Sequence, residues 1–323
     1  MTYAAAIIGC GKIGCGPDSP SGFALSHAGG YKRARGVELM AGADPDPANR
    51  RQMAERWSVT HAYEDWNLLY EAHRPDIVSL CVPTELHLSA FRDACNNGAR
   101  AIFMEKPLAP TLVEAQQMPA LAQDRLVVVA FHRRWNATLA KLAQEMQERS
   151  HGNVLQATIR YTKGLLVNGS HFIDLALWLL GKPVAAASLF RHPGGDPNDP
   201  GYDFRLDFQP GFSATFLHIP KAPYLFFEVD LLTDKGRVLI YERGQRLRID
   251  TTACDATYAG LSTLDQGPVL ETDWRDWPTK AVAELVQCLD TRRKPSCGLE
   301  DGLRVSAICH AIINNSGLIP YVD

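Results

Sequence analysis

Ala4-Ala-Ala-Ile-Ile-Gly-Cys-Gly-Lys-Ile-Gly14 is the stretch that decides the fold. A short apolar run, Tyr3–Ile8, leads directly into the pattern Gly9-x-Gly11-x-x-Gly14. A buried parallel strand that ends in a glycine turn has this form. Gly9 would permit the tight turn, Gly11 would let a phosphate approach the bare backbone, and Gly14 would let the next segment pack on the strand. The stretch therefore predicts a site for the phosphates of a dinucleotide, with a plain glycine-rich turn as the alternative.

Composition excludes several classes of function. The chain has 323 residues, 46% hydrophobic and 21% charged, which leaves room for two globular domains. Its net charge of −3 comes without a basic stripe, so nucleic acid is not expected as a partner. No apolar run approaches the roughly 20 residues that span a bilayer, and the N-terminus lacks a signal-peptide pattern. The eight cysteines have no metal-site spacing, which favours free thiols, no metal and a cytoplasmic location.

Strand-like and helix-like segments alternate through the first part of the chain. After Tyr3–Ile8, we expect strands at residues 37–43, 59–62, 76–82, 99–104 and 126–131. We expect helices at residues 47–57, 65–72, 85–97 and 111–122. This alternation predicts a doubly wound parallel sheet of the Rossmann type over residues 1–131. Pro17, Pro20 and Gly22 interrupt the segment 15–30, and a helix resumes near Ser26-His27-Ala28.

Asp44 follows the second predicted strand. A carboxylate at this place would accept hydrogen bonds from ribose hydroxyls and would repel a 2′-phosphate, which favours NAD over NADP. Asp44 lies 30 residues after Gly14, where about 20 is usual, and the segment 15–30 accounts for the excess. Alternatively, Asp44 or Asp46 caps the helix that begins near Pro47, and the two interpretations are compatible if Asp46 is the cap.

The pattern changes in residues 132–323, which we expect to form a second α/β domain. Apolar and polar residues alternate over 202–208, 212–216 and 225–231, as in half-buried strands of an antiparallel sheet. Helices are expected at Ser170–Gly181, with Ser170 or Asn168 as the cap, and at residues 280–290 and 299–314. Residues 251–273 look polar and irregular.

Four motifs carry a resemblance to a known family. They are Gly9–Gly14, Val82-Pro-Thr-Glu-Leu-His87, Glu105-Lys106-Pro107 and Asn168-Gly-Ser-His-Phe-Ile-Asp174. In this order they resemble the glucose-fructose oxidoreductase and inositol dehydrogenase family of NAD(P)-dependent sugar and cyclitol dehydrogenases. The resemblance implies a Rossmann domain, then an α/β domain whose open, mostly antiparallel sheet faces the nicotinamide. It also implies a homodimer or homotetramer formed through that sheet.

The cofactor is expected at the carboxyl ends of the parallel strands, because ligands of doubly wound sheets bind there. The residues expected to contact it are Gly9, Gly11, Lys12, Ile13, Gly14, Asp44, Pro83, Thr84, His87, Glu105 and Lys106.

The resemblance places Lys106 and His171 at the reaction centre. Oxidising an alcohol requires a proton acceptor and a group that stabilises the developing alkoxide. Asp174, three residues after His171 on one helix, would orient the imidazole. From the residues alone, the favoured interpretation makes Lys106 a surface partner of Glu105 and His171 an ordinary helix-start histidine, and the resemblance reverses both. Many members carry an aspartate four residues before the histidine, and here that position is Val167.

Other residues are weaker candidates for substrate contacts. They are Arg134, Tyr161, Lys163 and Asn168, besides His171, and each could instead be surface or packing. Together the motifs predict an NAD-dependent oxidoreductase that transfers a hydride between nicotinamide and a hydroxyl or keto carbon of a sugar, nucleotide-sugar or cyclitol. A non-catalytic NAD-binding sensor on the same fold is the alternative.

Overall fold

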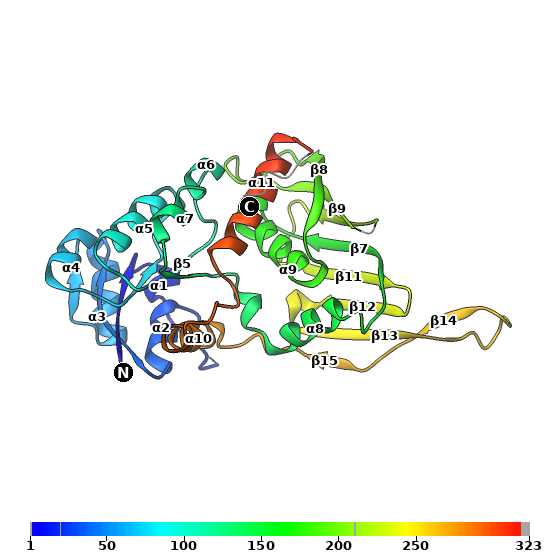
Figure 1. The fold of residues 1–323 in the computed structure, drawn as a ribbon, viewed down its shortest axis with the longest axis horizontal. Helices are drawn as coiled ribbons and strands as arrows, with labels where there is room; N and C mark the ends of the chain where they lie inside the picture. The colour runs from blue at the N-terminus through cyan, green and yellow to red at the C-terminus, as the bar shows by residue number, and fades with distance from the viewer. Residues whose placement is uncertain (1, 20, 210, 318–323) are drawn as a thin grey trace. The chain divides into compact units, whose positions relative to one another are not determined.

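A computed structural model describes residues 2–19, 21–209 and 211–317, and the chain forms two compact units (Figure 1). Residues 1–135 and 275–306 form the first unit, and residues 136–274 and those from Ala307 onward form the second. The expected boundary after residue 131 lies close to the first crossing. The return of residues 275–306 to the first unit differs from the expectation, because an amphipathic pattern shows which helix face is buried but not which sheet it covers. No helix of the described residues is long and apolar enough to cross a membrane.

The first unit is built on a six-stranded parallel sheet with the order β3-β2-β1-β4-β5-β6. The strands are β1 (Tyr3–Ile8), β2 (Val37–Ala43), β3 (His61–Tyr63), β4 (Ile77–Leu80), β5 (Ala101–Met104) and β6 (Leu126–Val129). The helices between them are α3 (Pro47–Trp57), α4 (Trp66–Ala72), α5 (His87–Asn96), α6 (Leu112–Ala115) and α7 (Met118–Ala122). The predicted doubly wound sheet is confirmed, and its order reverses between β1 and β4, where such sheets bind ligands.

Helix ends in this unit follow local chemistry. Asp46 caps α3 by accepting from Ala48 N at 2.8 Å, and Pro47 is its first residue. Thr111 and Glu114 form a capping box at the start of α6. The single helix expected over residues 111–122 is instead two short helices, and Pro119 lies in the first turn of the second. Proline has no N–H to donate within a helix, so it is tolerated only in such a first turn.

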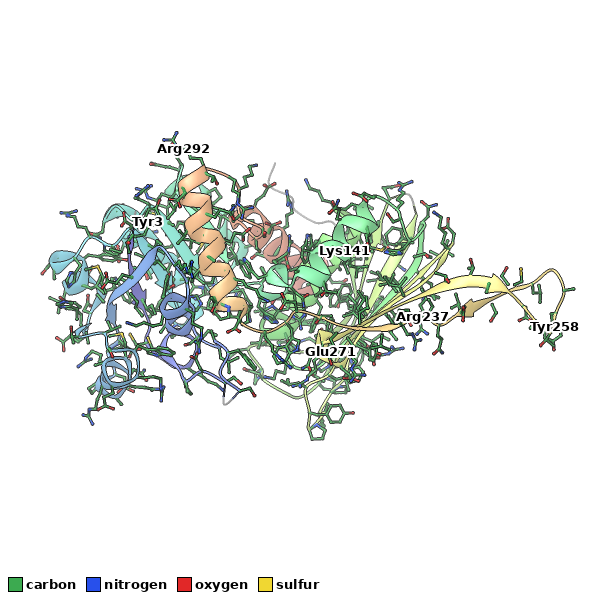
Figure 2. The ribbon with its side chains drawn as sticks, turned by 90° about the horizontal axis from the view of Figure 1, so that it is seen from below. Tyr3, Lys141, Arg237, Tyr258, Glu271 and Arg292 are labelled. Atoms are coloured by element: carbon green, nitrogen blue, oxygen red, sulfur yellow. The ribbon has the colours of Figure 1, made fainter. Side chains whose placement is uncertain are left out.

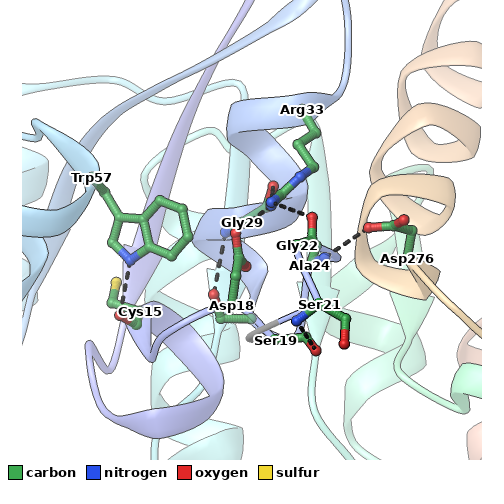
Figure 3. Close-up of polar contacts among 11 residues, drawn as sticks. Cys15, Asp18, Ser19, Ser21, Gly22, Ala24, Gly29, Arg33, Trp57 and Asp276 are labelled. Carbon is green, nitrogen blue, oxygen red and sulfur yellow. Dashed lines mark hydrogen bonds and ion pairs between the residues drawn. The ribbon is translucent and has the colours of Figure 1, made fainter.

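Between α1 (Lys12–Cys15) and α2 (His27–Arg33), specific contacts hold the described residues of the interrupted segment (Figure 3). Trp57 Nε1 donates to Cys15 O at 2.8 Å, and Ala24 N donates to Asp276 Oδ1 at 2.7 Å. Arg33 pairs with Asp18 and also donates to Gly22 O at 3.0 Å. Ser26 caps α2, so the helix resumes where the sequence predicted. These anchors let the long loop leave the parallel sheet undisturbed.

The second unit contains a nine-stranded sheet with the order β14-β13-β12-β11-β7-β10-β9-β8, and β15 also pairs with β13. The strands are β7 (Val154–Tyr161), β8 (Pro183–Arg191), β9 (Tyr202–Phe208), β10 (Phe212–His218), β11 (Phe227–Thr233), β12 (Gly236–Tyr241), β13 (Arg246–Cys254), β14 (Ser262–Asp265) and β15 (Val269–Glu271). Only the β7–β10 pair is parallel among the pairings described, which confirms a mostly antiparallel sheet. The prediction that 251–273 is irregular is wrong. Its strands are exposed on both faces, so they lack the alternation that marks a strand.

One face of this sheet packs on α9 (Ser170–Leu180), which lies beside α8 (Ala137–Gln147). The rings of Phe172 and Phe227 stack with centroids 3.9 Å apart. The helix begins at Ser170, directly after a π-helical turn over Leu165–Gly169, and Gly169 is its N-cap residue. Neither expected residue caps α9 through its side chain. Ser170 Oγ donates to Leu166 O, and Asn168 Nδ2 donates to Thr162 O at 2.7 Å. The sequence did not predict the π-helical turn before α9, because such a turn has no sequence pattern of its own.

Candidate active site

Glycine is favoured at each of the three positions after β1 for a different physical reason. Gly9 has φ of +92°, and a Cβ there would lie 2.5 Å from Cys81 O. A Cβ on Gly14 would collide with Gly9 O and lie 3.2 Å from the Ile7 side chain. Gly11 differs, because the nearest atom to its Cβ position is Asn49 Nδ2 at 4.0 Å. Gly9 and Gly14 therefore shape the loop, whereas Gly11 leaves space in front of bare backbone at the switch point, which fits a bound pyrophosphate.

Asp44 lies directly against this loop, although 30 residues separate it from Gly14. Its Oδ2 accepts from Cys10 N at 2.7 Å, and its Oδ1 accepts from Asp46 N at 2.9 Å. Asn49 Nδ2 lies 3.2 Å from both carboxylate oxygens. Asp44 is 8% exposed and lies beside the loop, while Asp46 caps α3, so the cap does not use Asp44.

His87 ties the end of β4 to the end of β5. Its Nδ1 lies 2.8 Å from Pro107 O, and its Nε2 lies 3.0 Å from Val82 O. Carbonyl oxygens only accept, so both ring nitrogens are directed at the chain itself. The residue is 1% exposed, and its expected contact with the cofactor stays a prediction. His87 fixes the Glu105-Lys106-Pro107 segment relative to Val82-Pro83-Thr84, where Pro83 and Thr84 remain accessible.

Glu105 pairs with His27, the first residue of α2, rather than lying free in solvent. His27 Nε2 lies 3.2 Å from Glu105 Oε1, and His27 Nδ1 lies 2.9 Å from Ser79 Oγ. Ser79 Oγ also bonds Tyr31 OH at 2.8 Å. His27 is fully buried and packs on the Phe103 ring at 4.2 Å. This buried network fixes the residue that precedes Lys106.

Lys106 follows β5 as a half-buried lysine, joined to Pro107 by a cis peptide bond. The positive charge of Lys106 acts on His132, which begins the turn after β6. Burial, with the charges of Arg133 and Lys106, lowers the pKa of His132 well below its usual range. A neutral imidazole and a cation therefore share this edge of the sheet.

Arg134 has a structural role in the first unit. It is 8% exposed, donates from Nη1 to Ser296 O at 3.2 Å and lies 3.5 Å from Asp301 Oδ1. These bonds brace the turn after β6 against the returning segment 275–306. The expectation of a substrate contact through Arg134 is corrected, because its guanidinium is buried against the chain.

The helix that carries His171, α9, belongs to the second unit. His171 and Asp174 are 9% and 1% exposed and lie one turn apart at the start of α9. Val167, four residues before His171, is 49% exposed, and Lys163 is exposed just after β7. Tyr161 is fully buried, and its hydroxyl donates to Tyr202 O at 2.7 Å. The prediction that Tyr161 lines a pocket is therefore corrected.

Comparison with known proteins agrees with this architecture. Residues 4–132 match the oxidoreductase family with an NAD-binding Rossmann fold. This part of the chain is similar to that family. The chain is 27% identical over 194 residues to myo-inositol 2-dehydrogenase of Thermotoga maritima, which covers 55% of each chain. It is 26% identical over 179 residues to D-glucoside 3-dehydrogenase of Escherichia coli, which covers 49% of this chain and 51% of the relative. These matches span about half the length of the curated relatives.

Similarity to solved structures extends beyond this matched part of the chain. Levoglucosan dehydrogenase in complex with NADH superposes with a TM-score of 0.80 at 17% identity, covering 100% of both chains. This similarity confirms the fold of both units. Among the residues that the structure describes, no group of three or more His, Cys, Asp or Glu side chains could hold a metal ion.

Sequence reasoning missed three buried residues of this sheet edge, namely His27, Ser79 and His132. His27 lies on a segment interrupted by prolines, and Ser79 lies in the middle of an apolar strand. A buried serine in β4 was a usable signal, because a polar group in a core requires a partner. His132 precedes two arginines, and nothing in that pattern indicates a neutral ring.

Proposed function

We propose that this protein is an NAD-dependent dehydrogenase that oxidises a hydroxyl carbon of a sugar or cyclitol, or reduces the corresponding ketone. The observation that carries this proposal is the edge of the first unit's sheet. There the open Gly11 backbone, the Asp44 carboxylate and the Lys106 ammonium follow three parallel strands of one sheet, β1, β2 and β5. The curated relatives act on inositol and glucosides by name, which supports this substrate class.

The chain would contribute binding and proton transfer. Bound NAD⁺ supplies the hydride acceptor. The Gly9–Gly14 loop and Asp44 would hold the pyrophosphate and the ribose. Lys106 would donate a hydrogen bond to the reacting oxygen and stabilise its negative charge, and His171 would take the hydroxyl proton with Asp174 orienting its ring. Pro83 and Thr84 would contribute backbone contacts beside the nicotinamide.

Reduction of NAD⁺ by a panel of sugars and cyclitols, followed by the absorbance of the reduced nicotinamide, tests the proposal. We expect turnover with at least one neutral member such as myo-inositol or glucose. Tight NADH binding without turnover on any member would favour the non-catalytic sensor, for which the described residues give no specific support.

The Asp44 carboxylate should make NADH bind at least about tenfold more tightly than NADPH, because a 2′-phosphate would meet a fixed anion. Asp44→Asn removes the charge and should bring the two affinities close together. Asp46→Asn is the matched control, since asparagine also caps a helix and the preference should stay. Fluorescence titration measures both ratios. Equal or tighter NADPH binding by the unaltered protein would contradict the role of Asp44.

We also propose that the second unit joins copies of this chain. Its outer sheet face carries cross-strand ion pairs, such as Arg160 with Glu228 and Arg237 with Asp230. The arm of β13, β14 and β15 exposes apolar side chains, with Tyr258 at its far end (Figure 2). Leu261 is 60% exposed and Leu270 is 45% exposed. Such apolar exposure is typical of a surface that is covered in an assembly.

Light scattering should therefore give a dimer or tetramer at micromolar concentration. Introducing charges through Leu261→Asp and Leu270→Asp should shift the protein to smaller species. Val113→Asp on α6, at a residue 68% exposed, is the control and should leave the assembly unchanged. A strict monomer would refute the assembly. Residues 251–273 extend the sheet edge, so they cannot serve as an intrachain cover for its face.

A further inference from the structure

Hydrogen bonds link the side chains of Tyr31, Ser79, His27 and Glu105 in one chain. Tyr31 and His27 come from α2, Ser79 comes from the middle of β4, and Glu105 directly follows β5. The His27 side chain is fully buried, whereas that of Glu105 is 14% exposed. The chain of bonds therefore joins the interior of the first unit to the segment that carries Lys106.

The direction of these hydrogen bonds follows from the donors and acceptors available. Burial raises the pKa of Tyr31 well above its usual range, so its hydroxyl keeps the proton. Among the described residues Ser79 Oγ is the partner of that hydroxyl, so Tyr31 donates to Ser79, because a buried proton without an acceptor is unfavourable. For the same reason Ser79 donates to His27 Nδ1, which leaves the ring proton on Nε2. Nε2 then donates to Glu105 Oε1, since a carboxylate accepts.

Aromatic rings hold the His27 imidazole in this orientation. The Phe103 ring lies 4.2 Å from it, and the Trp277 ring lies 6.3 Å away and edge-on, measured between ring centroids. Both ring nitrogens of His27 are bonded within the chain. The imidazole is thus closed to a ligand, and any effect of His27 on a reaction has to pass through Glu105.

Lys106 lies between two residues that histidines hold. On one side, Glu105 is held by His27 and by its own N–H, which donates to the last carbonyl of β4 at 3.1 Å. On the other side, Pro107 O lies 2.8 Å from His87 Nδ1. The backbone that carries the Lys106 side chain is therefore fixed before and after the lysine, which limits where its ammonium can lie.

We propose that His27 is a positioning residue for hydride transfer, acting through Glu105 to hold Lys106 at the reacting oxygen. Ser79 and Tyr31 assist by keeping the ring proton of His27 on Nε2. This role rests on the proposed function, because it requires that Lys106 bonds the oxygen of the reacting carbon. Misplacing a group at the reaction centre by about 1 Å can cost about 10²-fold in rate, even when the altered residue touches neither substrate nor cofactor.

Steady-state kinetics of NAD⁺ reduction by the full chain, with the faster of myo-inositol and glucose as substrate, tests this role. His27→Leu removes the donor to Glu105 and should lower kcat about 10–10²-fold, while KM and the NADH affinity change less than about threefold. His27→Gln returns an N–H near the place of Nε2 and should restore kcat to within about fivefold of the unaltered protein. Ser79→Ala, which leaves Nδ1 without its donor, should lower kcat about fivefold.

His151→Leu is the matched control. It breaks another histidine–glutamate pair, in the second unit, where His151 Nε2 lies 2.9 Å from Glu145 Oε2. Thermal unfolding of each variant is measured alongside the kinetics, because loss of either pair should lower the Tm. Of the two leucine variants, only His27→Leu should lower kcat.

An unchanged kcat in a folded His27→Leu, or a kcat in His27→Gln as low as in His27→Leu, would overturn the role of His27. If His27→Leu fails to fold, an unchanged kcat in Ser79→Ala overturns it. Failure of this role differs from failure of the proposed function. No turnover by the unaltered protein with either ring would refute the dehydrogenase and the role that rests on it, whereas normal turnover that persists in His27→Leu refutes only the positioning role.

Discussion

Lys106→Met is expected to lower kcat by about 10²–10⁴-fold, the usual cost of losing a group that acts on the reacting proton or its oxygen. Methionine keeps the length and apolar stem of lysine but cannot donate to a developing alkoxide. Because the Gly9–Gly14 loop and Asp44 would carry most of the cofactor contacts, NADH affinity should stay nearly unchanged. Steady-state kinetics and fluorescence titration measure the two quantities separately.

Lys141→Met on α8 is the control for this substitution. The Lys141 side chain is 78% exposed and only pairs with Glu145 within its own helix, so its replacement should leave kcat unaltered. Near-full kcat in Lys106→Met would mean that the lysine is only a surface charge, which was the other interpretation of its sequence context.

His171→Ala is expected to reduce kcat by a similar factor of about 10²–10⁴ and to remove the acidic limb of the pH–rate profile. The limb reflects a base that must be unprotonated before it can accept the hydroxyl proton, so it should vanish with the imidazole. The profile separates this role from a purely structural one, because a folding defect would lower activity without removing a limb. His310→Ala, at an exposed histidine of α11 (Leu299–Asn314), should change neither quantity.

Unchanged activity and an unchanged profile in His171→Ala would leave Lys106 as the proton carrier. Tyr161 cannot take that place, because its hydroxyl is buried against Tyr202. Val167 makes this outcome worth testing, since it occupies the position where many members of the resembled family have an aspartate. A lysine with one anion fewer nearby would release its proton more readily.

The parts of the fold that the sequence predicted are those set by near neighbours in the chain. The β1 strand and its glycine turn, the Asp46 cap and the resumption of α2 at Ser26 depend on a few consecutive residues. The place of Asp44 beside the glycine loop also follows from the strand order despite its distance from Gly14, because β1 and β2 pair in parallel and Ile8 lies opposite Ala43.

The parts that the sequence could not predict depend on contacts between distant segments. His27 meets Glu105 across 78 positions, and no local pattern encodes that pairing. Tyr161 illustrates the same limit, because a tyrosine at a strand end has one sequence signature whether its hydroxyl faces a pocket or a backbone carbonyl. The strands β14 and β15 escaped prediction because they bury no face.

Deuterium transfer is the most direct test of the proposal that this protein moves a hydride from a hydroxyl-bearing carbon to NAD⁺. The protein is incubated with NAD⁺ and a carbon-deuterated neutral ring, either myo-inositol or glucose, in ordinary water, and the nicotinamide product is analysed by mass spectrometry. We expect reduced cofactor that carries one deuterium taken from the hydroxyl-bearing carbon, and almost no reduced cofactor with Lys106→Met. No reduced cofactor with either ring, or reduced cofactor without deuterium, would contradict this proposal.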